Sequence, residues 1–290
     1  MKIGIYCSYW DKEWGGDPLP LIKKVRALGF DVLEVACANY DQLPDNYFDK
    51  MRKEAEKYEI ILTGGYGPIP EHNIASRNPA IVRNGFDFYS NIFPKMQRAG
   101  IKTLGGALYS YWPVDFSGEI NKAADTSFSI RNMKRIADLA ERYNITLLME
   151  SLSRFEGYII NTAKEAVDYV NAVNRENVKV LLDTFHMNIE EDNILDAIRT
   201  CGSYLGELHV GEANRRPPRE DGLPWDKIVK VLKEIAFDGN IVMEPFVNQG
   251  GKVGQDIKVW RNLLADDKEE TLDQAAGASV QYLKRLVETV

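Results

Sequence analysis

The sequence predicts a (β/α)₈ barrel (TIM barrel), an α/β fold of eight parallel strands each followed by a helix, with additional C-terminal helices. Three observations support this prediction. Apolar runs of strand length alternate eight times with stretches of helical periodicity. Four of these runs finish on a carboxylate or an imidazole, where barrel enzymes carry their chemistry. The rival fold, a doubly wound sheet, needs a glycine-rich turn after its first strand, and the chain has Cys7-Ser-Tyr-Trp there.

The strands are predicted from short apolar runs that lack turn residues. The run Val178–Leu182 shows the pattern well, because four of its five residues are apolar, as in a strand buried on both faces. In chain order, the expected strands occupy residues 2–7, 32–37, 60–65, 101–108, 145–150, 178–182, 204–212 and 240–245.

The helices are predicted from apolar residues at helical spacing and from residues that begin or end helices. Asp17-Pro18 opens the first helix, and Gly29 stands where a helix-ending glycine belongs. Thr162 and Glu165 form a T-x-x-E capping box before another helix. Further helices are expected over residues 46–58, 79–99, 126–143, 194–200, 225–237, 257–264 and 272–290.

Residues 1–290 are expected to form one barrel domain, closed by helices over about 256–290. A chain of this length can bury roughly three-quarters of its unfolded surface, so its core needs no disulfide. The three cysteines are an odd number without close spacing, which is typical of reduced thiols in a cytoplasmic protein.

The charge and hydropathy of the chain argue against two classes of partner. Lysine and arginine number 36 against 43 acidic residues, a net charge of −7, and the only basic cluster is Arg215, Arg216 and Arg219. A nucleic-acid-binding protein usually carries a larger basic surface. There is also no signal peptide and no apolar run long enough to span a bilayer. We therefore expect a cytoplasmic protein with no nucleic-acid or membrane partner.

Four potential metal ligands end four consecutive predicted strands. Glu150, Asp183, His209 and Glu244 are separated by 33, 26 and 35 residues. One strand–helix unit takes roughly 31 residues when eight units fill about 250, so the four fall on strands 5 to 8 and meet at the barrel mouth. Three carboxylates there repel one another unless a cation lies between them. Oxygen-rich ligands favour Mn²⁺, Co²⁺ or Mg²⁺ over a structural zinc ion.

Five longer motifs carry a family resemblance: LLDTFHMNIEED, GALYSYWP, RFEGYIINTA, MEPFV and DIKVWR. With them, nearly the whole chain resembles the ketose 3-epimerase family, the group of D-tagatose 3-epimerases and D-psicose (D-allulose) 3-epimerases. That family has a (β/α)₈ barrel and epimerises free ketohexoses at C3 with Mn²⁺ or Co²⁺. The resemblance therefore implies an isomerase of carbohydrate metabolism with a small-molecule ketose substrate, assembled as a homodimer or homotetramer.

The resemblance also implies roles for single residues. Glu150, Asp183, His209 and Glu244 would hold the metal, and Glu150 and Glu244 would also be the catalytic acid–base pair. The implied substrate-binding residues are Tyr6, Gly65, Ala107, Trp112, Glu156, His186, Arg215 and Phe246. The segments SLSRFE, GELHVGEANRRPPREDG and FVNQGG depart from the usual family pattern near the mouth, which bears on sugar preference more than on reaction type.

Epimerisation at C3 explains the need for two carboxylates. The C3 proton of a ketose is weakly acidic because C2 is a carbonyl, and a Lewis acid bound to O2 and O3 stabilises the enediolate. Inversion requires removal of a proton from one face and delivery to the other. Strands 5 and 8 are three apart in a ring of eight, which can set Glu150 and Glu244 on opposite sides of a sugar.

Three alternatives stay open at this point. An aldose–ketose isomerase would use similar ligands to move hydrogen between C1 and C2. A metal-dependent apurinic-site endonuclease shares the fold class but usually has more histidines and a basic face, whereas this chain has three histidines. A non-catalytic sugar-binding protein would need no opposed carboxylates. The preferred ketose, whether D-psicose, D-tagatose or L-ribulose, is also open.

Overall fold

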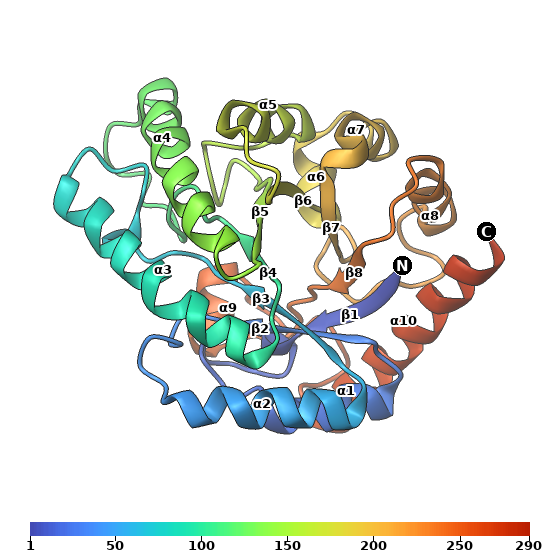
Figure 1. Ribbon diagram of the computed structural model, residues 1–290. Coiled ribbons are helices and arrows are strands. Elements are labelled where there is room, and N and C mark those ends of the chain that lie inside the picture. Colours follow the sequence, from blue (N-terminus) through green and yellow to red (C-terminus); the bar gives the residue numbers. More distant parts are fainter.

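The computed structural model describes residues 1–290 and shows a closed barrel of eight parallel strands (Figure 1). The strands follow one another around the ring in chain order, and the first strand pairs with the eighth to close it. The predicted fold class is confirmed. The strands are β1 (Lys2–Tyr6), β2 (Val32–Ala36), β3 (Ile61–Gly65), β4 (Thr103–Gly106), β5 (Thr146–Glu150), β6 (Val178–Asp183), β7 (Leu205–Val210) and β8 (Asn240–Met243).

Most of the helices surround the ring of strands on its outside (Figure 1). Three short 3₁₀ helices, at Cys7–Tyr9, Pro70–His72 and Gly202–Tyr204, lie in the connections. The α-helices are α1 (Leu19–Leu28), α2 (Asp45–Tyr58), α3 (Pro79–Ala99), α4 (Lys122–Glu141), α5 (Ala163–Val173), α6 (Thr184–Glu190), α7 (Ile194–Cys201), α8 (Trp225–Glu234), α9 (Gly251–Ile257) and α10 (Glu269–Thr289).

The residues that end α1 and begin α5 are those that the sequence predicted. Gly29 ends α1 with a φ of 102°, a left-handed conformation that glycine adopts without strain. Thr162 caps α5, and its hydroxyl accepts a hydrogen bond from the Glu165 N–H at 3.2 Å. The return bond of the predicted capping box goes elsewhere, because the Glu165 carboxylate accepts from the Asn161 N–H at 2.7 Å.

The prediction of a helix over residues 257–264 is wrong. The helix in this region, α9, begins earlier at Gly251 and ends at Ile257, where Lys258 takes a left-handed conformation. Val259 and Leu263 are both buried, and their spacing of four residues is the spacing of buried residues on one face of a helix, which led to the wrong prediction. The segment after Lys258 is instead an irregular loop against the β8–α9 connection, with the Leu263 N–H donating to the Val247 carbonyl at 2.8 Å.

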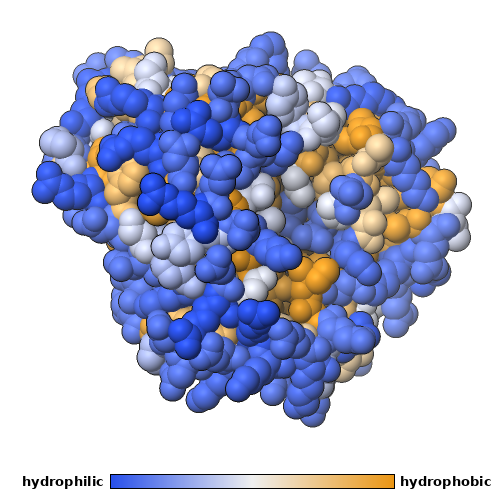
Figure 2. Space-filling view, in the orientation of Figure 1, coloured by the Kyte–Doolittle hydropathy of each residue, from blue (hydrophilic) through white to orange (hydrophobic).

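The outer surface of the molecule is mostly hydrophilic on the face seen in Figure 2, with hydrophobic side chains in separate areas near its centre and right edge. None of the helices combines the length and the apolar character that crossing a bilayer requires. Buried apolar side chains fill the space between the ring and the helices. On α3, for example, Ile92, Phe93 and Met96 are fully buried.

Candidate active site

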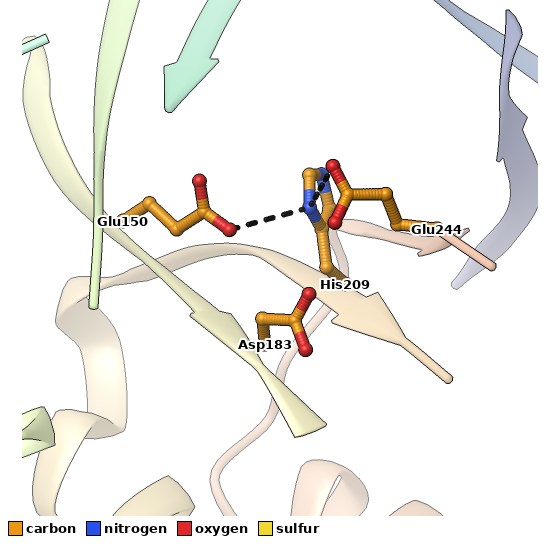
Figure 3. A group of neighbouring side chains, drawn as sticks. All are labelled: Glu150, Asp183, His209 and Glu244. Carbon is orange, nitrogen blue, oxygen red and sulfur yellow. Dashed lines mark ion pairs between the residues drawn. The ribbon is translucent and has the colours of Figure 1, made fainter. Parts of the chain in front are cut away.

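Four side chains converge at the carboxyl end of the barrel, and we call them the acidic cluster: Glu150, Asp183, His209 and Glu244 (Figure 3). Each offers one ligand atom, and these atoms all lie within 4.8 Å of one another. Three of the residues belong to β5, β6 and β7, and Glu244 directly follows β8. The structure thus brings together the four residues that spacing along the chain had selected.

Strand register explains why the acidic cluster faces inward. Asp183 pairs directly with His209. Glu150 pairs with Leu181, two residues before Asp183, and His209 pairs with Val242, two residues before Glu244. Side chains alternate between the two faces of a strand, so a shift of two residues keeps the same face. All four side chains therefore point to the interior of the barrel.

The His209 ring has two different environments. Its Nε2 lies 2.8 Å from the Glu34 carboxylate. Its Nδ1 is buried without a hydrogen-bond partner and lies 3.8 Å from both Glu150 Oε1 and Glu244 Oε1. A buried polar atom without a partner is costly. A divalent cation bound between these three atoms would satisfy it, so the acidic cluster fits a metal ion.

Burial and mutual repulsion perturb the acids of this cluster. Burial, followed by the charge of Glu244, raises the pKa of Glu150 well above its usual value. Burial also raises the pKa of Glu244, to about 8, although His209 and Arg215 oppose the shift. Burial alone would lower the pKa of His209, but Glu34, Glu207 and Glu244 raise it well above the ordinary value. Without a cation, the carboxyl groups of Glu150 and Glu244 therefore keep their protons to higher pH than ordinary acids do.

Glu156, His186 and Arg215 form a second group, which we call the arginine cluster. Arg215 donates through Nη2 to Glu156 at 2.8 Å and through Nη1 to Glu244 at 3.0 Å, so it joins the two clusters. Burial would raise the pKa of Glu156, but Arg215, His186 and the Trp112 indole lower it below its usual value. Glu156 is therefore held as a carboxylate beside a buried guanidinium.

His186 belongs to α6, a helix that the sequence had not predicted. Asp183 begins it, since the Asp183 carboxylate accepts hydrogen bonds from the N–H groups of Phe185 and His186. The Ser153 N–H donates to His186 Nδ1 at 3.1 Å, so Nε2 carries the ring proton. That nitrogen lies 3.4 Å from Arg215 Nη2. Two donors thus lie side by side, and an oxygen of the substrate between them could accept from both.

Aromatic side chains line the other wall of the cavity. Trp14 contacts Trp112 and Phe246 edge-on, with ring centroids 5.6 and 6.0 Å apart, and Tyr6 lies 6.2 Å from Phe246. The cavity has a volume of about 360 Å³, within the range of small-molecule sites. All eight residues predicted to bind substrate line it, including Gly65 and Ala107. Of the acidic cluster, only Asp183 is absent from the lining.

Comparison with known proteins identifies the family. Residues 22–263 match the xylose isomerase-like TIM barrel family. The chain is 46% identical over 291 residues to the D-psicose 3-epimerase of Enterocloster bolteae, covering 99% of this chain and 96% of that protein. The chain belongs to the ketose 3-epimerases of this family. It is also 45% identical to the D-psicose 3-epimerase of Agrobacterium fabrum, covering 97% and 98% of the two chains.

The solved structures agree with this assignment to the ketose 3-epimerase family. The crystal structure of D-psicose 3-epimerase with D-tagatose from Clostridium cellulolyticum superposes with a TM-score of 0.97 and 44% sequence identity. The superposition covers 99% of both chains. The resemblance stated from the sequence motifs is therefore confirmed.

Two of the residues that line the cavity but were missing from the predicted set contact members of that set. Glu34 contacts His209 directly, and Trp14 forms part of the aromatic wall. A signal for Glu34 was present, because it is the one charged residue in an otherwise apolar strand, Val32–Ala36. The signal for Trp14 was its place shortly after the first strand, as for other aromatic residues of the site; its indole donates a hydrogen bond to Asp256 at 2.9 Å.

Proposed function

We propose that this protein epimerises free ketoses at C3, with D-psicose and D-fructose as the first pair to test. The observation that carries the proposal is the pair Glu150 and Glu244, whose Oε1 atoms each lie 3.8 Å from His209 Nδ1. They come from β5 and from the end of β8, three strands apart in the ring. The names of the relatives, D-psicose 3-epimerases at 44–46% identity, support the same reaction.

Glu150, Asp183, His209 and Glu244 would hold a divalent cation, and the set of three carboxylates and one imidazole favours Mn²⁺, Co²⁺ or Mg²⁺. When bound, the cation supplies a Lewis acid for the oxygens of the ketose. The protein itself would move the proton: one of Glu150 and Glu244 takes it from C3 as a base, and the other delivers a proton to the opposite face.

The arginine cluster would bind the C1–C2 end of the sugar. His186 Nε2–H and the Arg215 guanidinium offer donors that face one point, and Glu156 offers an acceptor beside them. Such fixed contacts orient C3 between the two carboxylates without taking part in proton transfer. Tyr6, Trp112 and Phe246 would cover the apolar edges of the sugar.

Incubation in D₂O tests this proposal against an aldose–ketose isomerase. If Glu150 and Glu244 act on opposite faces, the proton removed is not the proton returned, so D-psicose formed from D-fructose should carry deuterium at C3. A hydride-shift isomerase would instead give an aldose without label. Chromatography and proton NMR of the product sugars distinguish the two results, and psicose with hydrogen retained at C3 would exclude the two-carboxylate mechanism.

We further propose one domain over residues 1–290, a cytoplasmic location and a homodimer or homotetramer. The continuous ring from β1 to β8 and the close packing of α10 on α1 and β1 support the single domain. Three buried free cysteines are compatible with a reducing compartment. Light scattering of the purified protein measures the number of chains, and a monomer at micromolar concentration would contradict the assembly proposed.

A further inference from the structure

Glu34 is a buried acid to which the proposed function gives no role. It lies in the middle of β2 with only 1% of its surface exposed. Its Oε2 is 2.8 Å from Nε2 of His209, the ring nitrogen that faces away from Glu150 and Glu244. A buried carboxylate at this distance from an imidazole affects first of all the orientation and protonation of that ring.

The hydrogen bond decides which nitrogen of His209 carries the proton. A neutral imidazole has one N–H and one lone pair, and a carboxylate only accepts. Nε2 is therefore the N–H, and the lone pair of Nδ1 faces Glu150 and Glu244. We infer that Glu34 is a positioning residue, which holds His209 in the orientation and tautomer whose Nδ1 can ligate the cation. This inference rests on the metal site of the proposed function.

Gly65 makes room for this arrangement. It pairs with Ala36 at the end of β2, and a Cβ atom at Gly65 would lie 2.6 Å from Glu34 Oε1 and 3.1 Å from the Tyr6 ring. Both distances are shorter than ordinary contacts, so an alanine there would displace the Glu34 carboxylate. Gly65, which the resemblance implies as a substrate-binding residue, therefore also has a structural reason to be glycine.

Glu207 provides a matched comparison within the same site. Its Oε1 lies 3.8 Å from the same His209 Nε2, beyond hydrogen-bond distance, and has no partner. Its Oε2 accepts a hydrogen bond from Asn240 at 3.1 Å. Glu34 and Glu207 thus place similar buried charges beside one nitrogen, but only Glu34 is close enough to fix the ring.

The test measures Mn²⁺ binding to metal-free protein by calorimetric titration, without any sugar. Glu34→Gln should weaken the affinity roughly 10- to 100-fold, the usual loss when the hydrogen-bond partner of a ligating histidine is removed. Glu34→Asp should also weaken it, because the charge is kept but the shorter side chain does not reach Nε2. Gly65→Ala should weaken it in the same direction. Glu207→Gln should have a clearly smaller effect than Glu34→Gln.

Nitrogen NMR of histidine-labelled protein supplies a second measurement that a merely structural role would not change. The chain has only three histidines, so the signals of His209 can be assigned by replacing His72 and His186 in turn. In metal-free parent protein, at a pH high enough for His209 to be neutral, the Nε2–H form should dominate. In Glu34→Gln, whose amide can also donate, the Nδ1–H form should increase.

Three results would overturn the inference. The first is that the Glu34→Gln and Glu34→Asp variants bind Mn²⁺ as tightly as the parent. The second is that Glu207→Gln loses as much affinity as Glu34→Gln, and the third is that each chain binds two ions. The last result would make Glu34 a ligand of a second ion. Failure of the proposed function looks different, since the parent itself would then bind no metal or would not epimerise ketoses. If the parent binds one ion and epimerises ketoses while the Glu34 variants bind the ion equally well, only the role inferred for Glu34 is wrong.

Discussion

The acidic cluster and the arginine cluster lie side by side in one cavity but are stabilised in opposite ways. In the acidic cluster, burial and like charge raise the pKa of both Glu150 and Glu244. In the arginine cluster, a guanidinium between two carboxylates lowers the pKa of Glu156 instead. The first cluster is incomplete without a cation, whereas the second already contains its own.

The two clusters also differ in what positions them. The acidic cluster stands on strands or directly after one, where the register of β5 to β8 fixes each side chain. The arginine cluster comes from two loops and the short helix α6, and its members position one another. This difference fits the two tasks proposed for the clusters, proton transfer by side chains on a rigid frame and substrate binding by segments whose residues position one another.

The largest expected effect follows from the acidic cluster. Glu150→Gln and Glu244→Gln should each lower kcat for ketose epimerisation by about 10² to 10⁴-fold, because a carboxamide does not accept a proton.

Exhaustive chelation should abolish turnover of the parent, and Mn²⁺ or Co²⁺ should restore it better than Zn²⁺. Initial rates with D-fructose, together with metal analysis of every sample, measure both effects. Full activity in metal-free protein would contradict the assignment of the cluster.

A smaller effect is expected from the arginine cluster. Arg215→Ala should lower kcat/KM on the order of 10²-fold while the protein still binds one metal ion, because orientation is lost and no proposed ligand is removed. Arg216→Ala is the matched control, since Arg216 lies in the same loop and its side chain donates to none of the cluster residues. Equal losses in the two variants would show that the loop, and not the guanidinium, matters.

The opposite electrostatics of the clusters can be measured without substrate. The folded-state pKa values of Glu150, Glu244 and His209 are raised, so the metal-free folded protein binds more protons than the unfolded chain between about pH 6.5 and 8.5. Stability must then fall as pH rises through this window, toward and past the Glu244 pKa of about 8. We expect the Tm of metal-free protein to drop on the order of 5 °C from pH 6.5 to 8.5.

The groups with lowered pKa do not obscure this measurement. Glu156 has a lowered pKa and stays ionised across the window, so it contributes the same amount at both ends. His186 also has a lowered pKa in the folded state, so it opposes the drop slightly near pH 6.5, where the unfolded imidazole still binds protons. Glu244→Gln is the control and should flatten the drop, since its side chain no longer titrates. Added Mn²⁺ should raise Tm more at pH 8.5 than at pH 6.5, because protons then compete less for the ligands. A Tm of metal-free protein that rises with pH would contradict the raised pKa values.

The difference in what positions the two clusters also explains how far the sequence alone could predict the site. Glu150, Asp183, His209 and Glu244 could be found from spacing, because a barrel repeats its strands at a nearly constant interval. Glu156, His186 and Arg215 have no such regularity, and only the family motifs pointed to them. Contacts between distant segments were also beyond the sequence: the pairing of Glu34 with His209 joins residues 175 positions apart.

The predicted boundaries of helices were wrong where contacts between distant segments, and not the local sequence, determine the backbone conformation. The segment after α9 has helical spacing of buried residues, yet it forms a loop that a backbone hydrogen bond from Leu263 to Val247 joins to the β8–α9 connection. Helix α6 was missed because its seven residues directly follow β6 without a turn, and only the cap at Asp183 marks its start. Propensity and periodicity do not contain these long-range constraints.

The smallest expected effect tests a single hydrogen bond at the edge of the arginine cluster. The Trp112 indole donates to Glu156 Oε2 at 3.0 Å, and Arg215 binds the other oxygen of that carboxylate. Trp112→Phe keeps an aromatic ring in the wall but removes the donor. A hydrogen bond to a charged group contributes about 1.5–3 kcal/mol, and Arg215 still holds Glu156, so we expect a loss in kcat/KM of about tenfold.

Trp14→Phe is the matched control, because the Trp14 indole donates to Asp256 on α9 and not to the arginine cluster. Steady-state kinetics with D-fructose and D-psicose should show the Trp112→Phe loss with both sugars, since Glu156 is proposed to bind the C1–C2 end that they share. The Trp14→Phe variant keeps a ring in the wall and leaves Glu156 untouched, so its loss in kcat/KM should be clearly smaller than that of Trp112→Phe. If both variants lose activity equally, the aromatic wall acts by shape alone, and the indole of Trp112 does not position Glu156.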